Sequence, residues 1–188
     1  MIQETIVTSI SASGSVHIAP MGVHIENDSF VILPFKPSRT LDNILETGHA
    51  VLSHCDDVRI FAGCLTGRRD WPLRACEHIE GFYLTNALAH VELGLLRRED
   101  DPVRPRLVCK AVHSAMHRPF QGFNRAQFAV LEAAILFSRL DRLPWEKIQG
   151  ELDYLAIALE KCAGERELEA WSWLLNAIEE HKQARVAP

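Results

Sequence analysis

Residues 4–35 read "ETIVTSISASGSVHIAPMGVHIENDSFVILPF", and this stretch decides the fold. Three β-rich runs, 4–10, 16–25 and 30–35, are separated by "SASGS" and "ENDS", whose small and polar residues are typical of turns. Short turns between successive strands predict an antiparallel meander. Pro20 interrupts the second run, so that strand is expected to lie at a sheet edge or to carry a bulge there. A kinked strand of this kind is a common device for closing a barrel.

The next elements alternate between helix and strand. Residues 38–49, "SRTLDNILETGH", predict a short helix with Ser38 or Thr40 as N-cap and Gly48 as its left-handed C-terminal residue. A strand is expected at 50–55, a helical turn or short helix at 56–67, and a hairpin pair at 83–100 and 105–117. The segment between these elements, 68–82, has no regular pattern.

The sequence pattern changes to helix at Asn124. Apolar residues recur on broad helical faces in three stretches, and we expect a three-helix appendage over residues 124–183. The predicted fold class is therefore α+β, an antiparallel barrel followed by helices. We predict two domains, the barrel over residues 1–121 and the helical C-terminal domain over 122–188, joined at the glycine-containing "RPFQGF".

Composition excludes several functions. The 188 residues are 47% hydrophobic and carry a net charge of −5, which disfavours nucleic-acid binding. The five cysteines are odd in number and form no Cys-x-x-Cys pair, so we expect reduced thiols in a cytoplasmic protein. Neither an export signal nor a stretch of about 18 apolar residues is present, and no membrane partner is expected.

The stretch "FKPSRT", residues 35–40, places two cations beside a predicted helix start. The simple interpretation is a capped helix with solvated charges. The functional interpretation is a phosphate site, in which first-turn N–H groups, the hydroxyls of Ser38 and Thr40, and the charges of Lys36 and Arg39 converge on a dianion. This is not a P-loop, because Gly-x-x-x-x-Gly-Lys is absent.

Two further patterns are candidate sites. In "APMGV" a bulge at Pro20 would expose main-chain groups, Met21 could be a core residue, and Gly22 would let a flat ring approach the backbone. Cys109, His113 and His117 have a spacing that places them on one face of either a helix or a strand, which allows a metal site as a minor alternative. No catalytic triad is evident, so a cofactor is expected to carry any chemistry.

Three of these stretches, "ETIVTSISASGSVHIAPMGV", "PFKPSRTLDNIL" and "NRAQFAVLEAAILFSRL", in this order resemble domain-of-unknown-function family 447. The barrel of that family is similar to the flavin-reductase-like FMN-binding split barrel. The resemblance implies FMN at the interface of a homodimer. It places the phosphate at the loop and helix start and the ring beside the second strand, and the candidate cofactor-binding residues are Pro20, Met21, Gly22, Phe35, Lys36, Ser38, Arg39, Thr40 and Asn43. The family usually has an asparagine on the next strand, where this chain has Ser53 or His54.

The resemblance implies cofactor binding more firmly than it implies a reaction. Our first hypothesis is an FMN-dependent oxidoreductase acting on an unknown small molecule, with no side chain assigned as acid or base. The alternative is a non-enzymatic module that binds flavin or a pterin phosphate. The absence of an evident acid or base near either motif favours this alternative.

Overall fold

The computed structural model describes residues 1–186, which form two compact units. The barrel unit comprises residues 1–55 and 70–120, and the helical unit comprises residues 56–69 and the chain from 121 onward. The domain boundary predicted from the sequence places residues 56–69 in the barrel domain. The structure groups this segment with the helices because Val58 and Ala62 belong to the same buried apolar cluster as the C-terminal helices.

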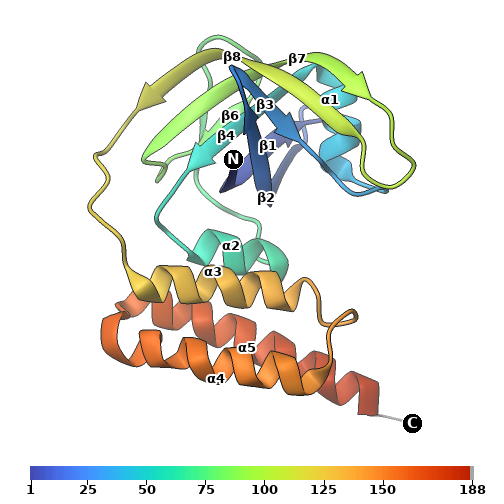
Figure 1. Cartoon of the computed structure of the whole chain (residues 1–188). Coiled ribbons are helices and arrows are strands. Elements are labelled where there is room, and N and C mark those ends of the chain that lie inside the picture. The colour runs from blue at the N-terminus through green and yellow to red at the C-terminus, as the bar shows by residue number, and fades with distance from the viewer. Residues whose placement is uncertain (187–188) are drawn as a thin grey trace. The chain divides into compact units, whose positions relative to one another are not determined.

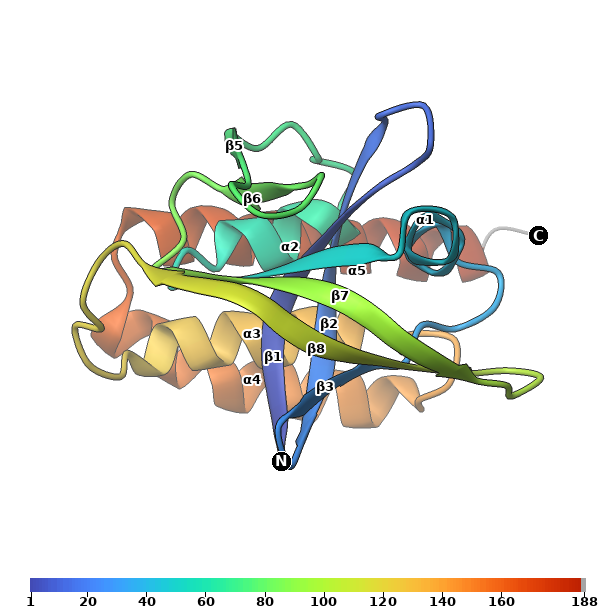
Figure 2. The ribbon, with the colours of Figure 1, turned by 90° about the horizontal axis from the view of Figure 1, so that it is seen from above.

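Six strands form a closed antiparallel barrel in the barrel unit (Figures 1 and 2). They follow the order β1-β2-β3-β8-β7-β4 around the barrel. Their bounds are β1 Ile2–Ile10, β2 Val16–Glu26, β3 Ser29–Ile32, β4 His49–His54, β7 Ala89–Glu99 and β8 Arg106–Met116. The predicted meander of the first three strands and the predicted hairpin of the last two are confirmed.

Pro20 lies on an open stretch of β2. The β2 strand pairs with β1 from Val16 to His24, without a register shift, but pairs with β3 only from His24 to Glu26. At Pro20, therefore, one edge of the strand has no partner strand, and the missing N–H group breaks no ladder there. Of the two expected arrangements, edge or bulge, the structure has the edge.

The short elements of the barrel unit lie outside the strand ladder. Helix α1 spans Arg39–Thr47, and Gly48 ends it with φ of 75°, which agrees with the predicted caps. Strands β5 (Leu73–Ala75) and β6 (Phe82–Leu84) form a separate two-stranded ribbon. The backbone N–H of Leu84 donates to Ser53 Oγ at 3.1 Å, which holds this ribbon against β4.

The helical unit contains α2 (Arg59–Leu65), α3 (Arg125–Phe137), α4 (Trp145–Cys162) and α5 (Glu165–Val186). The three predicted C-terminal helices are therefore present. Alanines make up much of the buried face of α3, which lets the neighbouring helices approach closely. None of the helices within residues 1–186 is long and apolar enough to cross a membrane.

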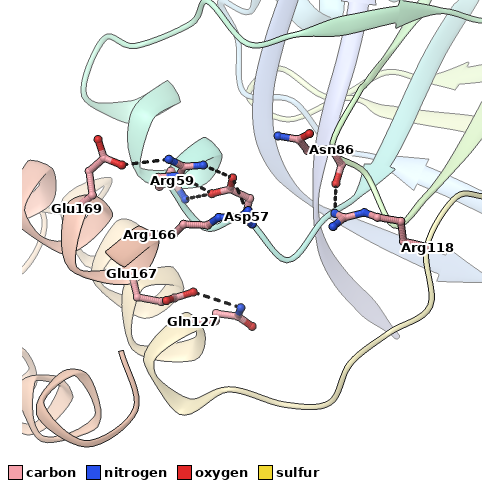
Figure 3. Close-up of polar contacts among 8 residues, drawn as sticks. All are labelled: Asp57, Arg59, Asn86, Arg118, Gln127, Arg166, Glu167 and Glu169. Carbon is pink, nitrogen blue, oxygen red and sulfur yellow. Dashed lines mark hydrogen bonds and ion pairs between the residues drawn. The ribbon is translucent and has the colours of Figure 1, made fainter. Parts of the chain in front are cut away.

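A buried ion pair anchors the start of α2 (Figure 3). The Asp57 carboxylate is 1% exposed and accepts hydrogen bonds from Arg59 Nε at 2.9 Å and Arg59 Nη2 at 2.7 Å. Arg59 Nη1 donates to Glu169 on α5 at 3.1 Å, and Arg166 lies 4.0 Å from Asp57. Burial alone would raise the pKa of Asp57, but the hydrogen bonds and charge of Arg59 outweigh it and lower the pKa. The carboxylate is thus ionised and ties α2 to α5.

Candidate functional site

The start of α1 combines a capped helix with a free cation. Ser38 is the N-cap, and its Oγ accepts a hydrogen bond from the backbone N–H of Leu41 at 3.3 Å. The side chain of Arg39 is exposed and makes no ion pair within residues 1–186. Thr40 is buried, with 1% of its surface exposed. The backbone N–H groups of Arg39 and Thr40 are the first two of the helix. The helix has no carbonyl acceptor for them, so they can bind an acceptor from outside the helix.

The loop before α1 is held by the turn between β7 and β8. The backbone N–H of Lys36 donates to the carbonyl of Val103 at 2.9 Å, and Lys36 Nζ donates to the carbonyl of Asp101 at 2.8 Å. The Asp101 carboxylate in turn accepts from the N–H groups of Val103 and Arg104, and these bonds lower its pKa. This ionised turn fixes where Lys36 lies.

Arg104 is a third cation at this loop, and the sequence interpretation missed it. Its Nε donates to the carbonyl of Leu33 at 2.9 Å, and its Cζ lies 4.6 Å from the ring centroid of Phe35. In the sequence it belongs to "REDDPVRP", which is typical of a solvated hairpin end. The turn between β7 and β8 reaches residues 33–37 only because β8 pairs with β3 in the barrel. No local sequence signal could therefore have identified Arg104.

The three candidates on β2 point in alternating directions. Met21 packs against the barrel core, whereas its neighbours Pro20 and Gly22 lie on the opposite face of the strand. A Cβ at Gly22 would lie 3.1 Å from Glu4 Oε1 and 3.1 Å from Ile2 Cγ2. The space next to Gly22 is therefore taken by the side chains of β1 in this arrangement, and a ring could reach the backbone only if these exposed side chains moved.

The remaining predicted residues are held by internal bonds. Asn43 is buried and its Nδ2 donates to Ser9 Oγ at 3.0 Å. Ser53 is fully buried, and besides its bond from Leu84 its carbonyl accepts from Thr5 Oγ1 at 2.9 Å. His54 is half-buried, and burial lowers its pKa. The imidazole of His54 is consequently neutral near pH 7.

Most of the predicted site residues fall into two groups. The residues from Phe35 to Asn43 share one loop and the helix that follows it. Pro20 and Ser53 share one cross-strand row, because both pair with Ile6 of β1. Two strand spacings of about 4.8 Å separate the members of that row.

A cluster of ionisable side chains lies on β7 and β8. Glu92 is fully buried and accepts hydrogen bonds from the N–H groups of Glu77 and His78 at 3.2 and 3.0 Å. His90 Nε2 lies 3.3 Å from Glu92 Oε1, and His90 Nδ1 lies 2.8 Å from Nε2 of His117. Burial alone would raise the pKa of Glu92, but these hydrogen bonds lower it. The sequence interpretation did not single out Glu92, because the residue pattern of β7 does not indicate that residues 77 and 78 pack over this side chain.

The prediction that Cys109 shares a face with His113 and His117 is wrong, whereas both histidines lie beside the ring of His90. Glu92 pairs with His113 but the next residue, Leu93, pairs with Ala111, so Val112 is an extra residue in β8. This bulge shifts the alternation by one. Cys109 consequently packs in the barrel core, where burial raises the pKa of its thiol to about 12, while His113 stacks on His78 outside the barrel.

Comparisons with known proteins identify relatives of this chain. It matches the N-terminal domain of the family described as protein of unknown function (DUF447) over residues 3–118, and the second part of that family over residues 124–176. No curated protein matches the sequence.

Solved structures share the fold. An FMN-bound protein of the same family from Methanosarcina mazei is similar over 94% of this chain and 94% of its own, with a TM-score of 0.80 and 19% identity. Nitrilotriacetate monooxygenase component B from Mycobacterium thermoresistibile is similar over 64% of this chain and 72% of its own, with a TM-score of 0.55 and 15% identity. 2-Nitrobenzoate 2-nitroreductase from Pseudomonas fluorescens is similar over 61% of this chain and 64% of its own, with a TM-score of 0.53 and 23% identity.

These similarities confirm the predicted α+β fold of the flavin-reductase-like, FMN-binding split-barrel type. The sequence resemblance to family 447 is confirmed by the two matched regions, which lie on either side of the predicted junction. Since the match over residues 3–118 alone spans more than half of the 188 residues, the chain belongs to the DUF447 family.

Proposed function

We propose that this protein is an FMN-binding flavoprotein that uses the flavin as a redox cofactor toward a small organic substrate. The observation that carries the proposal is the start of α1, where two unpaired N–H groups and an exposed guanidinium meet in a fold whose relative from the same family is FMN-bound. A helix start of this kind is a ready-made site for an anion.

The residues present at the helix start fit the phosphate of FMN. The N–H groups of Arg39 and Thr40 have no acceptor within residues 1–186. The Ser38 cap accepts from the N–H of Leu41, so the cap and a bound anion use different donors. Arg39 supplies a charge-assisted hydrogen bond, and Lys36 adds a second positive charge from the loop. Arg104 packs its guanidinium on the Phe35 ring and donates a hydrogen bond to the carbonyl of Leu33, and both contacts stabilise the conformation of the loop.

FMN, when bound, supplies hydride exchange at its ring, and the protein supplies binding and electrostatics. The two candidates on β4 are neutral groups. His54 has a pKa lowered by burial, and the Ser53 hydroxyl is committed to the N–H of Leu84. We therefore propose that His54 acts as a neutral hydrogen-bonding group at neutral pH rather than as a cation beside the cofactor.

We also propose that the flavin site is completed in a two-fold homodimer. Apolar side chains of the barrel unit are more than half exposed in the single chain, with exposed fractions of 57% for Ile2, 57% for Leu96, 52% for Val112 and 80% for Met116. Covering such surface stabilises an assembly by about 25 cal/mol per Å². A second copy of the barrel unit would remove this surface from water and shield a bound ring.

The dimer can be tested by sedimentation of the FMN-loaded protein. We expect a species of twice the 21.2 kDa chain mass, and we expect Met116→Asp to shift it toward the monomer because the new charge would be buried at the contact. Met116 is exposed in the single chain, so the substitution leaves folding intact. A stable monomer that still binds FMN tightly would contradict the proposal.

Flavin binding is tested by titrating the purified protein with FMN and following flavin fluorescence. We expect quenching that saturates at one FMN per chain, because a ring enclosed by protein is shielded from solvent. NADH or NADPH added anaerobically then tests the redox part, since loss of the oxidised flavin absorbance indicates reduction. Protein that stays colourless and leaves the fluorescence of added FMN unchanged would overturn the proposed function.

A further inference from the structure

The buried Glu92 carboxylate has no strong cation beside it. No lysine or arginine forms an ion pair with Glu92 in the part of the chain that the structure describes, and its polar neighbours are two backbone N–H groups and imidazoles. An ionised carboxylate with no exposed surface is costly unless a charge balances it. The hydrogen bonds keep the Glu92 carboxylate ionised, and this negative charge can accept a positive charge from another source.

His90 is already committed and orients the carboxylate. Its two ring nitrogens face Glu92 Oε1 and Nε2 of His117, at 3.3 and 2.8 Å, and the Tyr83 ring stacks on it at a centroid distance of 4.1 Å. One set of neutral tautomers satisfies this chain: His117 donates to His90, and His90 donates to Glu92. No lone pair of His90 is left for a further partner.

His78 and His113, in contrast, have free ring nitrogens. Neither imidazole makes a hydrogen bond within residues 1–186, although His78 Nδ1 lies 3.8 Å from Glu92 Oε1. The two rings stack with centroids 4.1 Å apart, and ligand atoms of His78, Glu92 and His113 all lie within 4.8 Å of one another. His78 comes from the loop between β5 and β6, Glu92 from β7 and His113 from β8.

We propose that His78, Glu92 and His113 bind one divalent transition-metal cation of the Zn²⁺ class. Two imidazoles and one carboxylate are a known ligand set for this ion, with metal–ligand distances of about 2.1 Å and a fourth position left to water. Tetrahedral ligands at that distance are separated by about 3.4 Å, so small side-chain movements from the present 4.8 Å limit complete the site. The His78 side chain is 46% exposed, which gives the ion a path from solvent.

The cation would join the β5–β6 loop to the barrel sheet. Glu92 already holds the backbone of this loop through Glu77 and His78, and a metal would add a bond to the His78 ring. The site does not depend on the flavin, because its three ligands lie outside the loop and row proposed for FMN. Metal binding and flavin binding can therefore succeed or fail separately.

Calorimetric titration of the chelator-treated protein with Zn²⁺, without added FMN, tests the site. We expect one equivalent to bind in the wild type. Loss of an orienting partner typically weakens a metal site 10- to 100-fold, so loss of a ligand in His78→Gln or His113→Gln should weaken binding by at least about 100-fold. Both positions are partly exposed, and neither ring takes part in a hydrogen bond with any described residue, so both variants are expected to fold.

Two matched variants define the ligand set. His24→Gln removes a histidine on β2 that lies outside the cluster, and it should bind Zn²⁺ like the wild type. Cys76→Ser should also bind normally, although Cys76 forms a second possible group with His90 and Glu92. Absence of a binding heat in the wild type would overturn the proposal, as would binding that is lost in Cys76→Ser but kept in His113→Gln.

Discussion

Replacing Arg59 with alanine is expected to lower the free energy of unfolding of the helical unit by about 3 kcal/mol, because the substitution leaves the Asp57 carboxylate buried without its partner. Asp57 is 1% exposed and accepts two side-chain bonds from the guanidinium. Removal of one member of a buried pair typically costs roughly 3–5 kcal/mol, and Arg166 at 4.0 Å keeps the value at the low end. Denaturant unfolding followed by tryptophan fluorescence measures it, since Trp145, Trp171 and Trp173 lie in the helical unit.

Glu169→Ala is the matched control for this pair. Glu169 bonds the same guanidinium, but its side chain is 47% exposed, so its loss should cost less than about 1 kcal/mol. Equal effects of the two substitutions would contradict the account of Asp57 as a buried charge that needs Arg59.

Acid should act on the same pair. The folded pKa of Asp57 lies below its ordinary value, so its contribution is fully present above the unfolded pKa of about 3.9 and is lost as the pH falls through the folded value. In Arg59→Ala the folded pKa should rise, because burial then dominates. The acid unfolding midpoint of this variant is therefore expected at higher pH than in the wild type.

The second large effect is expected at the phosphate site. A double variant, Lys36→Ala with Arg39→Ala, should weaken FMN binding far more than riboflavin binding, because riboflavin has the ring but lacks the dianion. A charge-assisted hydrogen bond contributes about 1.5–3 kcal/mol, so the loss of Arg39 alone corresponds to roughly a ten- to hundred-fold weaker FMN complex. Lys36 should add to this loss. Dissociation constants of both flavins, measured by fluorescence titration, give the difference.

Two comparisons separate phosphate binding from a structural role. Lys147→Ala removes an exposed cation of the helical unit and should leave both flavin affinities unchanged. Added inorganic phosphate should compete with FMN in the wild type and not in the double variant. If the double variant binds FMN normally and only melts earlier, the stretch is a capped helix start with solvated cations and the phosphate assignment is wrong.

Local signals made the helix start predictable from the sequence. Ser38 and Gly48 cap α1 as expected, because the capping preferences depend on the dihedral angles and hydrogen bonds of a few adjacent residues. The strands of the barrel were likewise evident from short β-rich runs between turn residues. The position of Lys36 and Arg39 beside this helix start follows directly from their place in the chain.

Contacts between distant segments could not be predicted in the same way. A bulge at Val112 reverses the alternation that the even spacing of Cys109 and His113 suggested. The covering of Glu92 depends on backbone N–H groups of residues 77 and 78, which belong to a segment with no regular pattern. Arg104 reaches the loop at Leu33 only through the closed barrel. Each of these features depends on long-range pairing, which periodicity does not encode.

The most direct measurement of the central claim is the identity of the small molecule that freshly purified protein releases on denaturation. Mass spectrometry and the absorbance spectrum of the supernatant identify it without any assumption about the reaction. The account predicts FMN, at up to one molecule per chain, with the phosphate present. Release of a different phosphorylated compound, or of no flavin by a protein that also fails to take up added FMN, would contradict it.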